Sequence, residues 1–181
     1  MPCICRGGCH EPTSCKLAAA IMPGVLQLKL LGAVPNHSGG KMSANPAIHP
    51  RVHDAIARDQ GIIEQFGLSV VSALDGRCEM VCVVPQRLVN AAGFAHGGVA
   101  FTLLDTACAY ALSSTGVQGV TINANSTYVK AAQGGSQLQA IVKVMSQSRQ
   151  LATLQGEVFL QNQGQSVLAA HGSFVFKVLN D

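Results

Sequence analysis

The fold of this 181-residue chain is limited most by one segment, Gly97–Ser114. The segment lacks proline, is rich in alanine and leucine, and is long enough for about five helical turns. Apolar residues fall on nearly every side of the helix that it predicts, which is typical of a helix buried all round. The rest of the chain therefore has to supply elements that enclose it.

Apolar runs of strand length lie on both sides of this segment in the sequence. Two precede it and are joined by Asp75-Gly76, a strong signal for a tight hairpin turn. Four follow it and are separated by short turn sequences. The predicted strands are Leu68–Leu74, Arg77–Val84, Val120–Val129, Gln137–Ser148, Leu151–Gln161 and Ser166–Leu179.

Two further segments complete the predicted architecture. Pro50–Gln65 is predicted as one helix, since proline suits a first helical turn. Gln86–Ala95 has no clear period and is predicted as a loop. The order is then helix, hairpin, long buried helix and consecutive antiparallel strands. This order predicts an α+β fold in which an antiparallel sheet wraps around one long central helix.

The composition excludes some classes of partner. Only 12% of the residues are charged and 48% are hydrophobic, so we expect a partner subunit to cover part of the surface. The net charge of +3 forms no basic stripe and the chain has no Trp, which argues against nucleic acid as a partner. The apolar stretch Leu17–Leu31 is interrupted by Pro23, Gln27 and Lys29, so no membrane span is predicted.

The N-terminal part of the chain differs in character from the rest. A loop sequence at 35–40 precedes Met42, so we expect an extension outside the core at 1–41 and the folded domain at 42–181. Four of the seven cysteines lie in this extension, at a spacing that matches no common zinc module, and we expect no metal. The odd count, with three cysteines in apolar segments, indicates a reducing compartment and a cytoplasmic protein.

Asp105 is the one carboxylate between Glu79 and Glu157. It lies in the most apolar part of the predicted central helix, where an ionised carboxylate costs several kcal/mol unless it is paired or used. The ordinary interpretation is a core aspartate that bonds to backbone or to a neighbouring hydroxyl. No cation lies near Asp105 in the sequence, however, and perturbed carboxylates concentrate at working sites. Asp105 is therefore predicted to be catalytic.

A glycine-rich motif, Asn90-x-x-Gly93-x-x-His96-Gly97-Gly98, directly precedes the central helix. A helix N-terminus exposes unpaired N–H groups and a positive dipole end, and glycines let a substrate approach the backbone closely. These are the requirements of an oxyanion hole for acyl transfer. Asn90 and His96 would add side-chain donors or orient the substrate. Taken alone, the motif also suits an ordinary junction between a loop and a helix.

The spacing of His96 and Asp105 has a consequence for assembly. They are nine residues apart, which separates them by about 13 Å along a helix. Within one chain they cannot act on the same carbonyl group. Two antiparallel helices related by a two-fold axis would bring them together. A working site therefore predicts a homodimer with two equivalent shared sites.

Residues Asn90–Ala109 resemble the signature of the hot-dog thioesterases of the phenylacetic-acid-degradation (PaaI-type) family. That pattern has Asn, Gly, His-Gly-Gly and then an apolar helix with an acid nine residues after the His. The similarity extends more loosely from Gly67 to Phe176 and includes the strand segment Gly119–Tyr128. Residues 1–41 have no counterpart. The resemblance implies the hot-dog fold, and it implies a homotetramer because tetramers are usual in relatives.

The resemblance implies hydrolysis of an acyl-CoA thioester, with no metal and no cofactor other than the coenzyme A of the substrate. Asp105 would act as general base or as nucleophile. The N–H of Gly97, helped by His96 and Asn90, would polarise the thioester carbonyl. Thr121 falls where relatives carry a hydroxyl that helps to hold the water. An ordinary strand threonine is an equally good interpretation of Thr121.

The binding of coenzyme A is expected to involve two cations. Lys130 falls where relatives often carry a basic residue followed by proline, although Ala131 replaces that proline here. Lys130 and Arg149 are the candidates for the CoA phosphates, and each would also serve as a solvated surface charge. His171, in the middle of a predicted strand, is interpreted as structural.

Other functions and several acyl groups stay open. A hydratase or dehydratase acting on acyl-CoA or acyl-carrier protein would share the fold but pairs its His and carboxylate differently. A non-catalytic acyl-CoA-binding module would not need Asp105 and would normally carry a DNA-binding segment, of which 1–41 shows no pattern. Phe94 and Leu88 are expected to line the acyl pocket. An aryl-acetyl, benzoyl or medium-chain acyl group would each be compatible.

Overall fold

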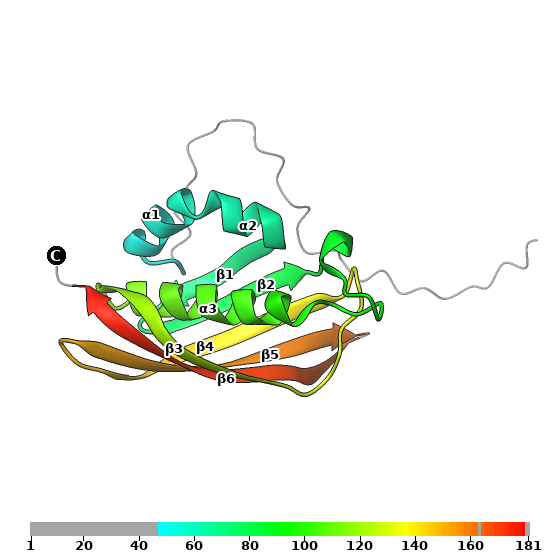
Figure 1. The fold of residues 1–181 in the computed structure, drawn as a ribbon. Helices are drawn as coiled ribbons and strands as arrows, with labels where there is room; N and C mark the ends of the chain where they lie inside the picture. The colour runs from blue at the N-terminus through cyan, green and yellow to red at the C-terminus, as the bar shows by residue number, and fades with distance from the viewer. Residues whose placement is uncertain (1–46, 163, 180–181) are drawn as a thin grey trace, which may run out of the picture. The chain divides into compact units, whose positions relative to one another are not determined.

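The computed structural model describes residues 47–162 and 164–179. A single long helix, α3 (Gly97–Ser113), lies against the concave side of a curved six-stranded sheet (Figure 1). The predicted central helix is confirmed to within one residue. The predicted extension at 1–41, its cysteines and the domain start at Met42 lie outside the described residues, so these stay predictions.

Every neighbouring pair of strands in the sheet is antiparallel, and the spatial order is β1-β2-β4-β5-β6-β3. Among the described strands β3 pairs with β6 alone, so no described strand occupies its other edge. All six predicted strands are confirmed, with ends shifted by one or two residues. Their bounds are β1 Leu68–Leu74, β2 Arg77–Val83, β3 Gln118–Tyr128, β4 Gln137–Gln147, β5 Leu151–Asn162 and β6 Gln165–Leu179.

The strand β3 is not regular along its length. Its pairing with β6 shifts register between Thr121 and Asn123, which inserts one extra residue into β3. Gly119 and Thr121 face α3 before this bulge, whereas Ala124 and Ser126 do so after it. Odd-numbered residues of β3 therefore face the helix before the bulge, and even-numbered residues face it after the bulge.

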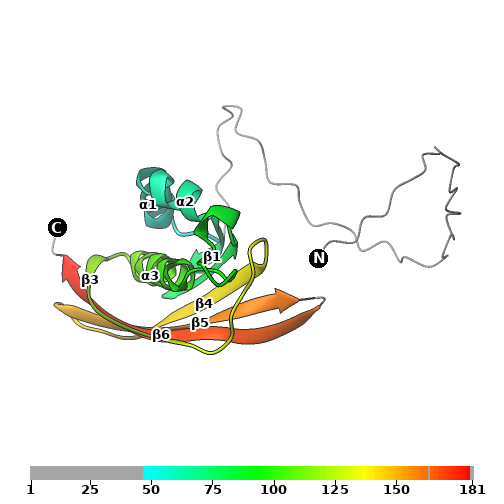
Figure 2. The same cartoon turned by 45° about the vertical axis from the view of Figure 1, so that its right-hand side comes forward.

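The first helix differs from its prediction. Two helices, α1 (Pro50–Arg58) and α2 (Gln60–Phe66), replace the single helix predicted at Pro50–Gln65. The break lies at Asp59, whose carboxylate Oδ2 accepts a hydrogen bond of 3.0 Å from the hydroxyl of Tyr110 on α3. Burial, followed by the charge of Asp59, raises the pKa of Tyr110. This long-range bond ties α1 and α2 to the side of α3 that faces away from the sheet (Figure 2).

The central helix packs unusually close to the sheet at one point. A Cβ atom on Gly156 of β5 would lie 2.6 Å from Cγ2 of Val142 and 2.8 Å from Cδ2 of Leu104 on α3. Glycine at this position therefore lets the helix and the sheet approach one another. Leu103, Leu104, Ala107 and Leu112 of α3 are fully buried by this packing.

One further short element completes the fold. The predicted loop 86–95 contains a 3-10 turn, Gln86–Leu88, and leads directly into α3. Within the described part of the chain, no helix is both long and apolar enough to cross a bilayer.

The packing at Gly156 predicts a specific loss of stability. Gly156→Ala should lower the free energy of unfolding by about 1–3 kcal/mol, because the added methyl overlaps Val142 and Leu104. The matched control is Gly61→Ala in α2, where an added Cβ meets nothing within 4 Å and should leave stability unchanged or raise it. Urea unfolding at one protein concentration measures both. Equal stability of the two variants would show that the helix is not held at this point.

Candidate active site

The first turn of α3 is capped by His96. The Nδ1 atom of His96 accepts a hydrogen bond of 3.0 Å from the N–H of Gly98, which leaves the ring proton of neutral His96 on Nε2. The N–H of Val99 donates to the carbonyl oxygen of His96 at 2.8 Å. The N–H of Gly97 has no hydrogen bond to any described residue. The helix start therefore offers one unused backbone donor, at Gly97.

Asn90 shapes the loop that precedes the helix. Its side-chain oxygen Oδ1 accepts hydrogen bonds from the N–H groups of Ala92 (2.9 Å) and Phe94 (3.1 Å). Its backbone N–H donates to the carbonyl oxygen of Phe94 at 2.7 Å. The amide Nδ2 of Asn90 has no partner among the described residues, so it remains available as a donor.

A cavity of about 300 Å³ lies at this end of α3. It brings together the predicted residues Asn90, His96 and Gly97 with Lys130 and Phe94. Leu88 does not line it and packs on the core instead, so its place in the acyl pocket stays a prediction. The other lining residues are mostly small or apolar: Ala95, Ala100, Tyr128, Val129, Ala131, Ala132, Leu138 and Ala169.

Asp105 lies elsewhere, on the part of α3 that faces the free-edge strand β3. Its Oδ1 accepts a hydrogen bond of 2.7 Å from the hydroxyl of Thr121. Leu104 and Thr106 beside it are buried, but Asp105 is only half-buried, because β3 is the last strand of the sheet. No cation pairs with Asp105 in the described residues, and its second oxygen Oδ2 accepts no hydrogen bond there. The hydroxyl bond agrees with the ordinary interpretation of Asp105, and its catalytic role stays a prediction.

The two halves of the predicted site are separate within one chain. Asp105 and Thr121 do not line the cavity that contains His96 and Gly97. The helical spacing of about 13 Å accounts for this separation.

The two predicted phosphate-binding cations lie at opposite ends of the molecule. Lys130 lines the cavity at the start of α3. Arg149 lies instead beside Gly116 and Gln118, at the start of β3, in a shallower hollow. A single chain therefore does not bring the two cations together.

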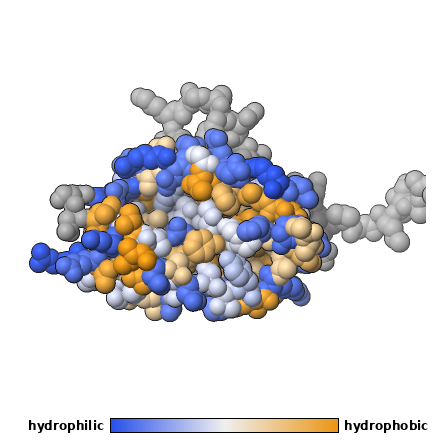
Figure 3. Space-filling model, viewed as in Figure 1, coloured by the Kyte–Doolittle hydropathy of each residue, from blue (hydrophilic) through white to orange (hydrophobic). Residues whose placement is uncertain are grey.

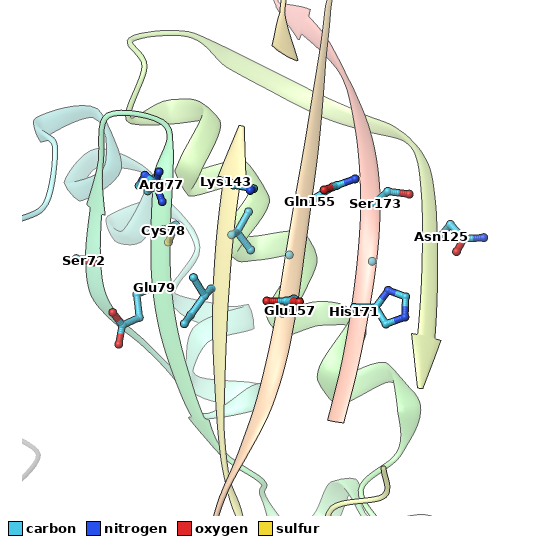
Figure 4. A pocket seen from close by; sticks show the side chains of 14 residues that line it. Ser72, Arg77, Cys78, Glu79, Asn125, Lys143, Gln155, Glu157, His171 and Ser173 are labelled. Atoms are coloured by element: carbon cyan, nitrogen blue, oxygen red, sulfur yellow. The ribbon is translucent and has the colours of Figure 1, made fainter. Parts of the chain in front are cut away.

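His171 is not part of either half. It is exposed on the face of the sheet that turns away from α3, directly opposite Glu157 on the neighbouring strand (Figure 4). Arg77 and Lys143 lie opposite one another on the same face. These residues line a hollow of about 640 Å³ that no helix covers.

The cysteines of the domain are core residues. Burial raises the pKa of Cys82 to about 11, and burial followed by the charge of Glu79 raises that of Cys78 to about 12. Cys108 is also buried and free. Thiols held in this way are inert rather than nucleophilic. In the described part of the chain, no three His, Cys, Asp or Glu residues gather closely enough to hold a metal ion.

Comparison with known proteins identifies the family. A sequence model of the thioesterase superfamily matches residues 92–167. Human acyl-coenzyme A thioesterase 13 is 35% identical over 109 residues, which cover 58% of this chain and 75% of that protein. The chain belongs to the thioesterase superfamily. It is a thioester hydrolase, as the sequence predicted.

Two bacterial thioesterases extend this result. Acyl-coenzyme A thioesterase PaaI of Escherichia coli is 27% identical over 109 residues, covering 60% of this chain and 78% of that protein. A hypothetical thioesterase of Streptococcus pneumoniae, solved with coenzyme A, matches with a TM-score of 0.64 and 23% identity over 70% of this chain and 98% of that one. The predicted family resemblance and the hot-dog fold are confirmed.

Sequence reasoning missed one polar residue that lines this cavity. Tyr128, the last residue of β3, lines it beside Gly97. Only its place at the end of a strand was visible in the sequence. Its contact with the helix start depends on how β3 lies along α3, which a local pattern does not contain.

The cap formed by His96 gives a prediction about stability. His96→Ala should lower the free energy of unfolding by about 1 kcal/mol, because the N–H of Gly98 loses its acceptor. His96→Asn should restore most of that loss, since asparagine is a strong N-cap residue. Urea unfolding distinguishes the two variants. If His96→Ala is as stable as the wild type, the cap contributes nothing to the fold.

Proposed function

We propose that this thioesterase hydrolyses an acyl-CoA thioester to the free acid and coenzyme A, with Asp105 as its catalytic carboxylate. The observation that carries the proposal is the state of Asp105. One carboxylate oxygen is fixed by the hydroxyl of Thr121, and the other is unengaged by the described residues. A carboxylate oriented in this way can take a proton from water or attack a carbonyl carbon.

The other half of the reaction needs donors for the carbonyl oxygen. The unused N–H of Gly97 lies at the positive end of α3, where it can stabilise negative charge on that oxygen. His96 and Asn90 line the same cavity, and each keeps one donor free. We assign the cavity to the thioester carbonyl and the groups next to it.

We propose that the complete site forms between two chains. Three contacts show that α3 runs opposite to β3: Gly97 meets Tyr128, Asp105 meets Thr121, and Leu112 meets Gly119. A two-fold axis that joins the free edges of two β3 strands would place the helix start of one chain near Asp105 of the other.

The surface around β3 suits such an interface. An unpaired strand edge invites pairing with another strand. Val120 and Ile122 of β3 are 49% and 55% exposed, and Phe101 of α3 is also exposed. Figure 3 shows apolar patches over the face of the molecule on which β3 and α3 lie. Pairing of two chains would remove this apolar surface from water.

As general base, Asp105 would accept a proton from water while the water oxygen bonds to the carbonyl carbon. The resulting tetrahedral intermediate would break its C–S bond, and the departing thiolate would recover the proton from Asp105. Attack by Asp105 itself, through an acyl-enzyme anhydride that water then cleaves, needs the same residues. The hydroxyl of Thr121 would hold the carboxylate, and with it the water, in either case.

The two-fold axis would also gather the phosphate-binding cations. Lys130 lies just after the end of β3, and Arg149 lies beside its start. Antiparallel pairing of two β3 strands would therefore bring Lys130 of one chain toward Arg149 of its partner. Coenzyme A bound to the Streptococcus pneumoniae thioesterase and the names of the acyl-CoA thioesterase relatives support this type of substrate.

An aryl-acetyl group is the acyl group that we propose. Phe94, Val129 and Leu138 give the cavity apolar walls, and its size suits a small ring. The Escherichia coli relative is described as coming from the phenylacetic acid degradation operon, which supports a similar substrate. We propose a cytoplasmic enzyme that uses no metal and no cofactor beyond the CoA of its substrate.

The spacing of the catalytic pair agrees with one further observation. The Streptococcus pneumoniae thioesterase has also been crystallised with an aspartate and, separately, a threonine replaced by alanine, and these two positions are 16 apart. Asp105 and Thr121 are 16 apart as well. The equal spacing supports the choice of Asp105 and Thr121 but does not carry it.

A homotetramer is our proposal for the full assembly. The sheet face that carries Arg77, Lys143 and Glu157 is uncovered and bears both signs of charge, so it can pair with a copy of itself. A light-scattering mass of four chains would support this, and a mass of two would limit the assembly to the dimer.

The carboxylate is tested by Asp105→Asn. The variant should lose at least about 100-fold in kcat on aryl-acetyl-CoA, because an amide can neither accept the proton nor attack the carbonyl carbon. Thiol release from a panel of aryl and alkyl thioesters measures this. The matched control is Asp75→Asn in the β1–β2 turn, where asparagine tolerates the positive φ of 51° and activity should be retained. A fully active Asp105→Asn would reject Asp105 as the catalytic carboxylate, and a wild type that releases no thiol would leave an acyl-CoA-binding module as the better description.

The shared site is tested by mixing two inactive variants. Asp105→Asn and Gly97→Val should each be inactive alone, the second because a side chain there overlaps Tyr128. Unfolded together and refolded, they should recover about one quarter of wild-type activity, since half of the random dimers hold one intact site of two. Recovery of nothing, while the mixed dimer is present by mass, would place the whole site within one chain.

A further inference from the structure

Tyr128 lies over the first turn of α3. A Cβ atom on Gly97 would lie 3.3 Å from Cζ and 3.4 Å from the hydroxyl oxygen of Tyr128, which is tighter than side chains normally pack. The phenol ring therefore rests on the backbone of Gly97 itself. A side chain at this position would push the ring a few tenths of an ångström away from the helix start.

The backbone beyond Tyr128 is anchored. The N–H groups of Val129 and Lys130 both donate to the carbonyl oxygen of Ala169, at 2.8 Å and 3.0 Å. The hydroxyl of Tyr128 makes no hydrogen bond to any described residue, and the side chain is 53% exposed. A phenol with an unused donor is thus held at the mouth of the cavity.

The donors at the helix start are few. The N–H of Gly98 is engaged by His96, and that of Val99 by the carbonyl of the same residue. The N–H of Gly97 has no hydrogen bond to any described residue and stays available as a donor. Oxyanion holes generally use at least two donors aimed at the same oxygen. The hydroxyl of Tyr128 is the side-chain donor that packs directly against Gly97.

We infer that the hydroxyl of Tyr128 is a catalytic donor that, with the N–H of Gly97, binds the carbonyl oxygen of the thioester. This inference rests on the proposed function. As water adds to the carbonyl carbon, the π electrons move onto that oxygen, and both donors strengthen their bonds to it. Tyr128 keeps its proton throughout, and the C–S bond then breaks as the oxyanion collapses to the acid.

A donor of this kind acts on the transition state more than on the bound substrate. Its hydrogen bond is stronger to an oxyanion than to a neutral carbonyl. Its removal therefore lowers kcat and leaves KM nearly unchanged. A residue that only shaped the cavity would change KM.

The test is Tyr128→Phe, which keeps the ring on Gly97 and removes only the hydroxyl. We expect kcat to fall by about 10- to 100-fold with KM within about threefold of wild type. The matched control is Thr127→Val, which removes a hydroxyl from the next residue, on the opposite face of β3. The control should keep wild-type kcat.

The hydroxyl of Tyr128 could act on the thioester carbonyl or on the partner's Asp105. A pH profile of the activity distinguishes these two targets. If Tyr128 acted on that carboxylate, Tyr128→Phe would displace the acidic limb of kcat/KM. If Tyr128 acts on the carbonyl, the limb stays in place and the rate falls equally at each pH. A displaced limb, or a kcat within twofold of wild type, overturns the inference.

The inference and the proposed function fail in different ways. An inactive Asp105→Asn beside a fully active Tyr128→Phe would reject the role of Tyr128 alone. A wild-type protein that hydrolyses no acyl-CoA thioester would reject the proposed function, and the role of Tyr128 with it.

Discussion

The contact between α3 and the sheet at Gly156 sets how closely the helix that carries Gly97 and Asp105 lies on the sheet. Leu104 rests over a position without a side chain, so the helix sinks into the curved sheet at this level. One residue further along, Asp105 is then turned toward β3 and the hydroxyl of Thr121. The first turn of α3, with Gly97, comes to lie under Tyr128 in the same way. A helix held further from the sheet would keep its sequence but lose both contacts.

The antiparallel course of α3 and β3 separates two kinds of chemistry along one helix. The N-terminal turn has the positive end of the helix dipole and the free N–H of Gly97. The carboxylate of Asp105 lies more than two turns away. This separation keeps the negative carboxylate from occupying the donors that a substrate oxygen needs. Within one chain the two groups cannot face one thioester, which is why the proposed site is shared by two chains.

Much of this arrangement could be predicted from the sequence because it depends on local patterns. The apolar length of α3, the Asp75-Gly76 turn and the glycine-rich start of the helix each have a short-range signature. The break at Asp59 has no such signature, and the hydrogen bond that Asp59 accepts there comes from Tyr110, 51 residues away. The half-exposed state of Asp105 depends in turn on β3 being the last strand of the sheet. Tyr128 was missed for a related reason, since its neighbour Gly97 is brought to it only by the fold.

The bulge in β3 decides which side chains of that strand face the helix. In an uninterrupted strand, Thr121 and Tyr128 would point to opposite faces of the sheet, because they are seven positions apart, which is an odd offset. The extra residue restores both to the side of the helix. Insertion or deletion of a single residue between them would turn the side chains of one half of the strand to the opposite face of the sheet. The number of residues in this segment therefore matters more for the positions of Thr121 and Tyr128 than the identity of most of its side chains.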